Sequence, residues 1–259
     1  GEGRGGRGAG VVGGGGREGP EVGKGGVGAG DLRTPPGSGG AAGGAMLAGH
    51  TGSATSRGLP AVRGALGADH GRHGGVEIPP DRFAVTAGGM NAIMQAAQVL
   101  LEPGDEIIIP SPAWPNLREA VRIAGGVPVT VPYRTLPDGR FALPLADIAA
   151  AITPRTRVIM VNSPSNPTGD VLTITQMAAL VTWARERGIV VASDECYALL
   201  PWTVDEVPSV LDPRVNGGSL DGVLCVYSLS KQSNLAGYRA AFVAGDPAQP
   251  VRKVLLAVD

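Results

Sequence analysis

Short apolar runs alternate with helical stretches from residue 83 onward, and this alternation limits the possible folds more than any other feature. Apolar residues at helical spacing predict helices at 88–101, 114–124, 145–152 and 173–187. The runs rich in Val and Ile predict strands at 83–86, 106–110, 127–131, 157–161, 189–192, 222–227 and 240–244. Strands that alternate with such helices form crossover units, and continuous apolar strands are typical of a sheet covered on both faces. The sequence therefore predicts a three-layer α/β/α fold with a mostly parallel sheet.

The first 48 residues have a different composition. Of the 42 glycines, 22 fall in residues 1–50, and no aromatic residue precedes Phe83. Such a segment buries too little apolar surface to offset the entropy of ordering its backbone. We therefore predict a disordered, low-complexity segment at 1–48 and a folded domain at 49–259. The GEGRGGRG run is similar to RNA-binding Arg-Gly repeats, but nearby acidic residues cancel much of its charge, which favours a flexible leader.

The charge balance and the short apolar runs exclude several classes of protein. A net charge of −1 provides no electrostatic surface for nucleic acid. No apolar run reaches the roughly 18–20 residues that a membrane-spanning helix needs. Cys196 and Cys225 are too few for a disulfide framework or a structural zinc site. We therefore expect a cytoplasmic protein without metal that binds neither nucleic acid nor membranes.

The unusual residues of the chain follow the predicted strands, where parallel α/β sheets bind their ligands. Gly88, Gly89 and Met90 open a helix after the first strand, and bare backbone N–H groups there can approach an anion. The spacing matches neither a Walker loop nor a dinucleotide-binding loop. An ordinary tight turn is therefore the alternative interpretation.

A second turn, rich in hydroxyl groups, follows the strand at 222–227. It contains Ser228, Ser230 and Lys231, and Arg239 lies eight residues after the lysine. These hydroxyls and cations can form a phosphate site, and a lysine can also trap a carbonyl group. A solvated lysine on a polar loop is the alternative.

Four further residues follow other strands. Asp194 ends a strand close to Tyr197, and its carboxylate can face a ligand cation or cap a helix. Asn166 lies among strong turn formers, so a turn alone can explain it. Trp114 lies between two prolines after a strand, where it can stack on a planar ring or pack in the core.

The order of four motifs is more specific than any one of these residues. The chain contains SPAWP at 111–115, NSPSNPTG at 162–169, SDECY at 193–197 and SLSKQSNLAGYR at 228–239. From about residue 49 to its end, it resembles the class I and II (fold-type I) aminotransferases, which use pyridoxal 5'-phosphate. Within that family, DECY and SLSKQSNLAGYR look most like N-succinyldiaminopimelate aminotransferase, whereas SPAWP and GGMNAIMQ look more like aspartate aminotransferases.

The resemblance implies a role for each residue of these turns. Lys231 condenses with the cofactor's aldehyde and then moves a proton between substrate and cofactor. Asp194 pairs with the pyridine nitrogen, Tyr197 and Asn166 bind the phenolic oxygen, and Asn166 also helps to hold the substrate carboxylate. Trp114 stacks on the ring. The residues that the resemblance assigns to the phosphate are Gly88, Gly89, Met90, Ser228, Ser230 and Arg239.

The resemblance also implies the reaction, which moves an amino group between an amino acid and a 2-oxo acid, and a homodimer. Two alternatives stay open: a β-eliminating carbon–sulfur lyase with the same cofactor, and an inactive remnant that binds cofactor or a partner. Gln232 stands where relatives often have arginine, and no tyrosine precedes Tyr133 to match the family's N-terminal tyrosine. Family members continue into a small domain that grips the substrate carboxylate. We therefore expect a complete cofactor site, a missing small domain and weak turnover.

Overall fold

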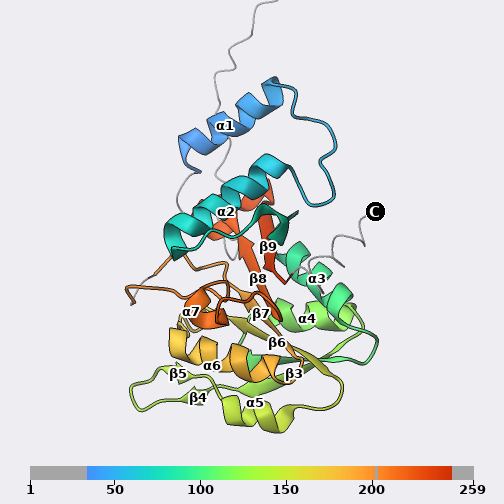
Figure 1. Ribbon diagram of the computed structural model, residues 1–259, viewed down its shortest axis with the longest axis vertical. Helices are drawn as coiled ribbons and strands as arrows, with labels where there is room; N and C mark the ends of the chain where they lie inside the picture. Colours follow the sequence, from blue (N-terminus) through green and yellow to red (C-terminus); the bar gives the residue numbers. More distant parts are fainter. Residues whose placement is uncertain (1–33, 202–203, 247–259) are drawn as a thin grey trace, which may run out of the picture. The chain divides into compact units, whose positions relative to one another are not determined.

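Seven strands form the main sheet of the computed structural model, which describes residues 34–201 and 204–246. They are β1 (Phe83–Thr86), β2 (Glu106–Ser111), β3 (Val127–Pro132), β6 (Thr156–Asn162), β7 (Val190–Asp194), β8 (Val223–Ser228) and β9 (Ala241–Gly245). Their order across the sheet is β1-β9-β8-β7-β6-β2-β3 (Figure 1). β9 is antiparallel to both of its neighbours, and the other pairs are parallel. The predicted mostly parallel sheet is confirmed.

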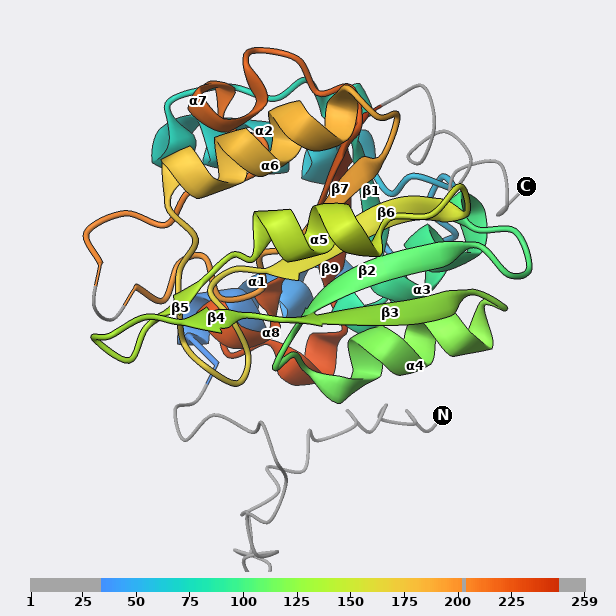
Figure 2. The same ribbon diagram turned by 90° about the horizontal axis from the view of Figure 1, so that it is seen from below.

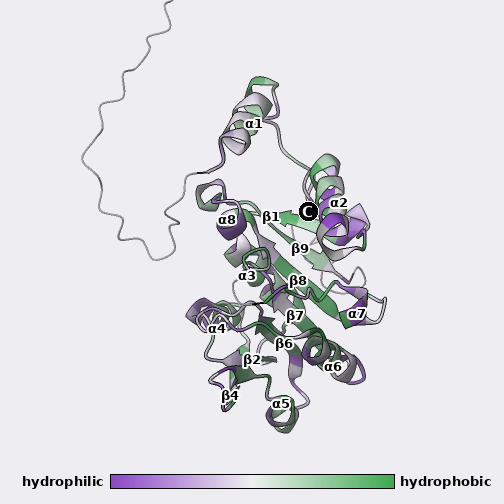
Figure 3. Cartoon of the chain, turned by 90° about the vertical axis from the view of Figure 1, so that its left-hand side faces the viewer, coloured by the Kyte–Doolittle hydropathy of each residue, from purple (hydrophilic) through white to green (hydrophobic). Residues whose placement is uncertain are grey.

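Helices cover both faces of this sheet (Figure 2). One face packs against α3 (Gly89–Leu100) and α4 (Pro115–Ile123). The other face packs against α2 (Pro60–Gly74), α5 (Leu145–Ala151), α6 (Ile174–Arg185) and α7 (Pro213–Asn216). Figure 3 shows the hydrophobic strands, in green, between these two helical layers. The three-layer architecture is therefore also confirmed.

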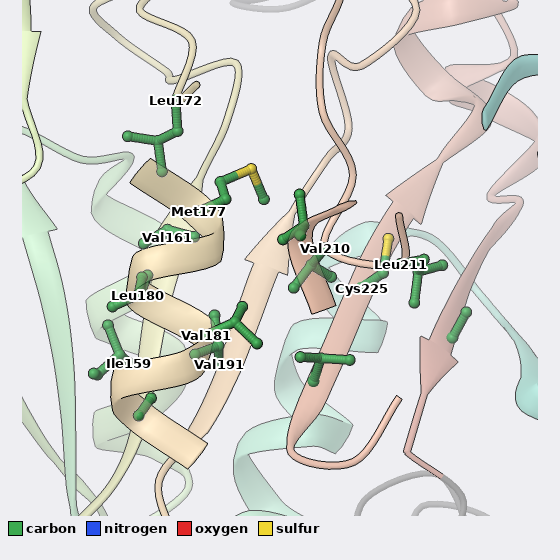
Figure 4. Packing of buried hydrophobic residues seen from close by; sticks show 14 of the residues in the cluster. Ile159, Val161, Leu172, Met177, Leu180, Val181, Val191, Val210, Leu211 and Cys225 are labelled. Atoms are coloured by element: carbon green, nitrogen blue, oxygen red, sulfur yellow. The ribbon is translucent and has the colours of Figure 1, made fainter. Parts of the chain in front are cut away.

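Side chains along β6 alternate between two apolar clusters. Val158 and Met160 belong to the cluster under α3 and α4, whereas Ile159 and Val161 belong to the cluster under α6. Figure 4 shows Ile159 and Val161 next to Leu180 of α6. Because successive side chains of a strand point to opposite faces, a strand covered on both sides must be apolar at every position. This requirement explains the uninterrupted apolar run in the sequence.

The carboxyl ends of β1 and β8 lie at the same edge of the sheet, although the two strands do not pair. Both strands are antiparallel to β9, and Thr86 and Ser228 both lie opposite Ala241, the first residue of β9. β2, β3, β6 and β7 run parallel to β8, so their carboxyl ends meet at this edge too. The turns after these strands are therefore neighbours, as the strand pattern predicts.

Several short elements were not expected from the sequence. β4 (Arg134–Thr135) and β5 (Phe141–Ala142) form a small separate hairpin. The others are a one-turn helix, α8 (Leu229–Gln232), and two 3-10 segments, Pro80–Arg82 and Ala236–Tyr238. Two to four residues are too few for a hydrophobic period to be recognised.

The structure differs from the prediction of disorder at the end of the first segment. A helix, α1 (Pro36–Leu47), occupies most of residues 34–48 and contains no buried residue. Helical hydrogen bonds are local and proline is favourable in the first turn, so a helix can begin here, but the glycines in α1 and the lack of buried residues make it a weak one. Residues 1–33, which the same prediction covers, lie outside the described residues. None of the helices described in the structure is long and apolar enough to cross a membrane.

Candidate functional site

Gly88 and Arg239 bring two turns together that are far apart in the sequence. Gly88 is buried, precedes α3 and has a φ of +96°. A Cβ atom at this position would lie 2.7 Å from Cζ of Arg239, so the close approach of the guanidinium requires glycine. Arg239 lies just before β9, and its Nη1 donates a hydrogen bond to the carbonyl oxygen of Ala236 at 2.9 Å. The guanidinium thus packs against the N-terminus of α3.

The turn after β8 adjoins the same helix end. A Cβ atom built on Gly89 would lie 3.5 Å from Cβ of Ser228. The Ser228 Oγ accepts the backbone N–H of Ser230 at 3.2 Å and lies 3.0 Å from the Ser230 Oγ. Two hydroxyl groups, a guanidinium and a helix N-terminus therefore meet at one corner of the strand edge. This set of donors suits a phosphate group.

Asn162 connects the carboxyl ends of β6 and β7. Its side-chain amide donates to the carbonyl oxygen of Asp194 at 2.8 Å, and its Oδ1 accepts the backbone N–H of Asn166 at 2.6 Å. Asn162 is buried at the end of β6. It therefore fixes the loop that carries Asn166 relative to the end of β7.

The Asp194 carboxyl group is buried at this edge, with only 5% of the residue exposed. Its Oδ1 accepts the backbone N–H of Cys196 at 3.2 Å. Burial raises the pKa of Asp194, and hydrogen bonds from Cys196 oppose this effect. A cationic N–H group beside this carboxyl would favour its charged form.

Tyr197 lies between Asn166 and Lys231. The Asn166 Nδ2 donates to the Tyr197 hydroxyl oxygen at 3.4 Å, and the Lys231 Nζ lies 6.0 Å from the centre of the tyrosine ring. Burial and, next, the charge of Asp194 raise the pKa of Tyr197, so its hydroxyl group stays protonated. Lys231 is half-buried in α8 and is the single lysine within residues 34–201 and 204–246.

The other two predicted residues lie in apolar surroundings. Met90 in α3 and Trp114 just before α4 are half-buried and pack against the apolar cluster on that face of the sheet. Trp114 follows β2, so it is near the carboxyl ends of the strands, as expected. Their contacts with a ligand stay predictions.

Asn162 and Cys196 also belong to this site, although neither was predicted from the sequence. The Cys196 Sγ would lie 3.4 Å from a Cβ atom on Gly89, so the thiol fills the space beneath the N-terminus of α3. Both residues belong to the quoted motifs, NSPSNPTG and SDECY, and that membership was the available signal. Neither residue type suggests a connecting role unless its neighbours in space are known.

The strand edge thus combines an anion-binding corner, a buried carboxyl group and one amine. Such an arrangement can hold a ligand that carries a phosphate, a ring nitrogen and a carbonyl group. A family model for class I and II aminotransferases matches residues 47–258. This chain belongs to that family. Its members depend on pyridoxal phosphate.

Individual relatives agree with this assignment. The chain is 36% identical over 203 residues to the aspartate aminotransferase of Geobacillus stearothermophilus, a match that covers 78% of this chain and 50% of the relative. It is 40% identical over 196 residues to the transaminase OxyQ of Streptomyces rimosus, named for 4-dedimethylamino-4-oxo-anhydrotetracycline, covering 74% of this chain and 50% of OxyQ.

Solved structures show the same likeness. The fold superposes on the aspartate aminotransferase of Thermus thermophilus with maleate at a TM-score of 0.81 and 34% identity, covering 90% of this chain and 58% of that one. The chain spans about half the length of the curated relatives named above.

Proposed function

We propose that this chain carries the cofactor site of a pyridoxal phosphate-dependent transaminase, which moves an amino group between an amino acid and a 2-oxo acid. The observation that best supports the proposal is the approach of Arg239 to Gly88, because it adds a cation to a helix N-terminus at the strand edge that also holds Asp194 and Lys231. A Cβ atom at position 88 would overlap the Arg239 guanidinium, so glycine lets this cation lie against the N-terminus of α3. The residues present therefore fit a phosphate group.

The position of each residue at this strand edge is consistent with one role in binding the cofactor. Arg239, Ser228, Ser230 and the backbone of Gly88, Gly89 and Met90 would bind the phosphate. Asp194 would accept a hydrogen bond from the ring N–H, and Tyr197 and Asn166 would donate to the phenolic oxygen. Trp114 would stack on the ring. When bound, pyridoxal phosphate supplies an aldehyde for amine capture and a ring that accepts electrons.

Lys231 would act as the nucleophile and the proton carrier. A lysine must be neutral to attack a carbonyl. When its amine is free, the Nζ atom would accept the proton that leaves the substrate Cα and would hold it for delivery to the other side of the reacting bond. General acid–base steps of this kind contribute about 10²–10⁴-fold to the rate.

Aspartate is the amino-acid substrate that we propose. The relatives in Geobacillus and Thermus are named aspartate aminotransferases, which favours aspartate over N-succinyldiaminopimelate. Asn166 would help to hold the substrate carboxylate. We also propose a cytoplasmic homodimer, on the family resemblance, and analytical ultracentrifugation tests the dimer.

Borohydride labelling tests cofactor capture. The chain contains three lysines, Lys24, Lys231 and Lys253. Pyridoxal phosphate should produce a visible absorbance band, and reduction followed by peptide mapping should place the label on Lys231. K231R should abolish the band, while K24R and K253R should retain it. Equal labelling of the three lysines would contradict the proposal.

Turnover assays separate the reaction types. With aspartate and 2-oxoglutarate, a transaminase forms glutamate only when both substrates are present, and K231A should lower this rate at least 10²-fold. A carbon–sulfur lyase would instead release pyruvate and ammonia from a cysteine conjugate without an acceptor. Lyase activity without transamination would replace the proposed reaction, and cofactor capture without either activity would indicate an inactive binding protein.

A further inference from the structure

The one-turn helix α8, which carries Lys231, depends on outside contacts for its orientation. A helix of four residues has too few internal hydrogen bonds to be stable alone. Its beginning is held from outside, because the Leu229 N–H donates to the carbonyl oxygen of Ala240 at 3.1 Å. The Ser228 Oγ also caps the helix by accepting the Ser230 N–H at 3.2 Å. The direction in which Lys231 points therefore depends on what holds the other end.

The two faces of α8 have different surroundings. Residues three or four apart in a helix share a face. Leu229, Gln232 and Ser233 accordingly line one cavity of about 610 Å³, on the face of the sheet opposite α3. Lys231 is not among the described lining residues of this cavity, and its Nζ lies 6.0 Å from the centre of the Tyr197 ring. A rotation of α8 about its axis would therefore move Lys231 away from Tyr197.

Tyr227 holds Gln232, the last residue of α8, to the sheet. The Tyr227 hydroxyl group donates a hydrogen bond to the Gln232 Oε1. Tyr227 is itself fixed, because it is buried in β8 and its ring stacks on that of Phe242 with the ring centres 5.0 Å apart. Burial is the largest cause that raises the pKa of Tyr227, so the hydroxyl group keeps the proton that it donates. A rigid donor thus holds the end of α8.

The residue types at this contact are matched to each other. Relatives often have arginine at the position of Gln232, and a guanidinium carries only hydrogen-bond donors. An arginine there could not accept a hydrogen bond from the Tyr227 hydroxyl group, whereas the amide oxygen of glutamine can. The contact therefore depends on the particular pair of residues that this chain has.

We propose that Gln232 is a positioning residue for Lys231. Its hydrogen bond from Tyr227 fixes the rotation of α8, and this rotation aims the Lys231 side chain at the strand edge that holds Asp194. The role in amine transfer rests on the proposed function, because it requires Lys231 to capture the cofactor. The placement of the lysine does not, since the contact joins two residues of the chain itself.

Competitive labelling of lysines with acetic anhydride tests the placement of Lys231 without cofactor. Peptide mapping measures the acetylation rate of Lys231 relative to that of Lys24, an internal reference in the same sample. Tyr227→Phe removes the hydroxyl group and retains a ring that stacks on Phe242. Gln232→Met removes the acceptor oxygen and retains the length of the side chain. Each variant should release α8 and expose the half-buried lysine, so its relative rate should rise about two- to tenfold, the range expected for one hydrogen bond.

Two further variants show whether the hydrogen bond itself is responsible. The double variant Tyr227→Phe/Gln232→Met should give the same relative rate as either single variant, within about twofold, because both changes remove the same bond. Ser233→Ala is the matched control, since it changes a half-buried side chain that lines the same cavity and leaves the bond between Tyr227 and Gln232 in place. It should leave the rate at Lys231 unchanged.

Titration with pyridoxal phosphate tests the consequence for cofactor capture. The concentration that half-saturates the visible band should rise about two- to tenfold in Tyr227→Phe and in Gln232→Met, and it should stay the same in Ser233→Ala. The absence of a band in the wild-type chain would contradict the proposed function. The labelling experiment would still decide whether Gln232 positions Lys231, so the two failures are distinguishable.

Four outcomes would overturn the proposal. Unchanged labelling in either single variant would show that the bond does not place Lys231. A rise in the double variant equal to the product of the two single rises would show that Tyr227 and Gln232 act separately. An equal rise in Ser233→Ala would assign the effect to packing. Altered labelling with unchanged cofactor affinity would show that the rotation of α8 does not matter for cofactor capture.

Discussion

Gly88 and Gly104 have similar backbone angles but different neighbours. Their φ values are +96° and +88°, a region that disfavours residues with a Cβ atom. The Cβ position of Gly88 overlaps the Arg239 guanidinium, whereas that of Gly104 has no atom within 4 Å. Gly88→Ala should therefore displace Arg239 and weaken pyridoxal phosphate binding by about tenfold or more, since a charge-assisted hydrogen bond is lost. Equilibrium dialysis with the cofactor measures this change.

Gly104→Ala is the matched control at the scale of single residues. Both variants should lose roughly 1–3 kcal/mol of unfolding free energy from backbone strain alone. Only Gly88→Ala should lose affinity for the cofactor. Equal cofactor affinities in the two variants would show that Arg239 does not hold the phosphate.

Glu106 shows how one side chain anchors a whole element, the beginning of β2. Its carboxylate accepts hydrogen bonds from Thr153 Oγ1 at 2.6 Å, Thr156 Oγ1 at 3.1 Å and Arg155 Nη2 at 3.1 Å. The bond from Thr153 is the largest cause that lowers the pKa of Glu106 below its ordinary value of 4.5, against the effect of burial. A lowered pKa means that the folded state binds fewer protons than the unfolded state. The stabilisation is therefore complete above about pH 5 and is lost as the pH falls through the folded pKa.

Glu106→Gln tests this pH dependence. The variant should be less stable than the wild type by about 1–3 kcal/mol at pH 7, and the difference should shrink below about pH 4. Urea unfolding at several pH values measures it. Glu102→Gln, at an exposed position near β2, should change stability by less than about 0.5 kcal/mol at any pH. A Glu106→Gln difference that stays constant down to pH 3 would contradict the ionic role of Glu106.

At the scale of the whole molecule, stability is concentrated in the centre of the sheet. β8 is buried along its full length, and all but one residue of β6 and of β7 are buried, whereas α1 has no buried residue. Regions with few buried contacts open at low free-energy cost. The amides of α1 should therefore exchange with solvent deuterium much faster than those of β6, β7 and β8. Hydrogen-exchange mass spectrometry measures these rates, and protection of α1 equal to that of β6 would show that α1 is held by packing.

The sequence by itself determined the sheet, its two helical layers and the motifs that supply Asp194, Lys231 and Arg239. Those features follow from local patterns, because the period of apolar residues and the turn formers are visible along the chain. Tertiary structure alone decided which residues meet. Arg239 approaches Gly88 because β1 and β8 both pair with β9, and Asn162 joins Asp194 to Asn166 because their strands are neighbours. The burial of Glu195 and its hydrogen bond from the backbone N–H of Val210 are likewise visible only once the chain has folded, since both depend on contacts between separate segments.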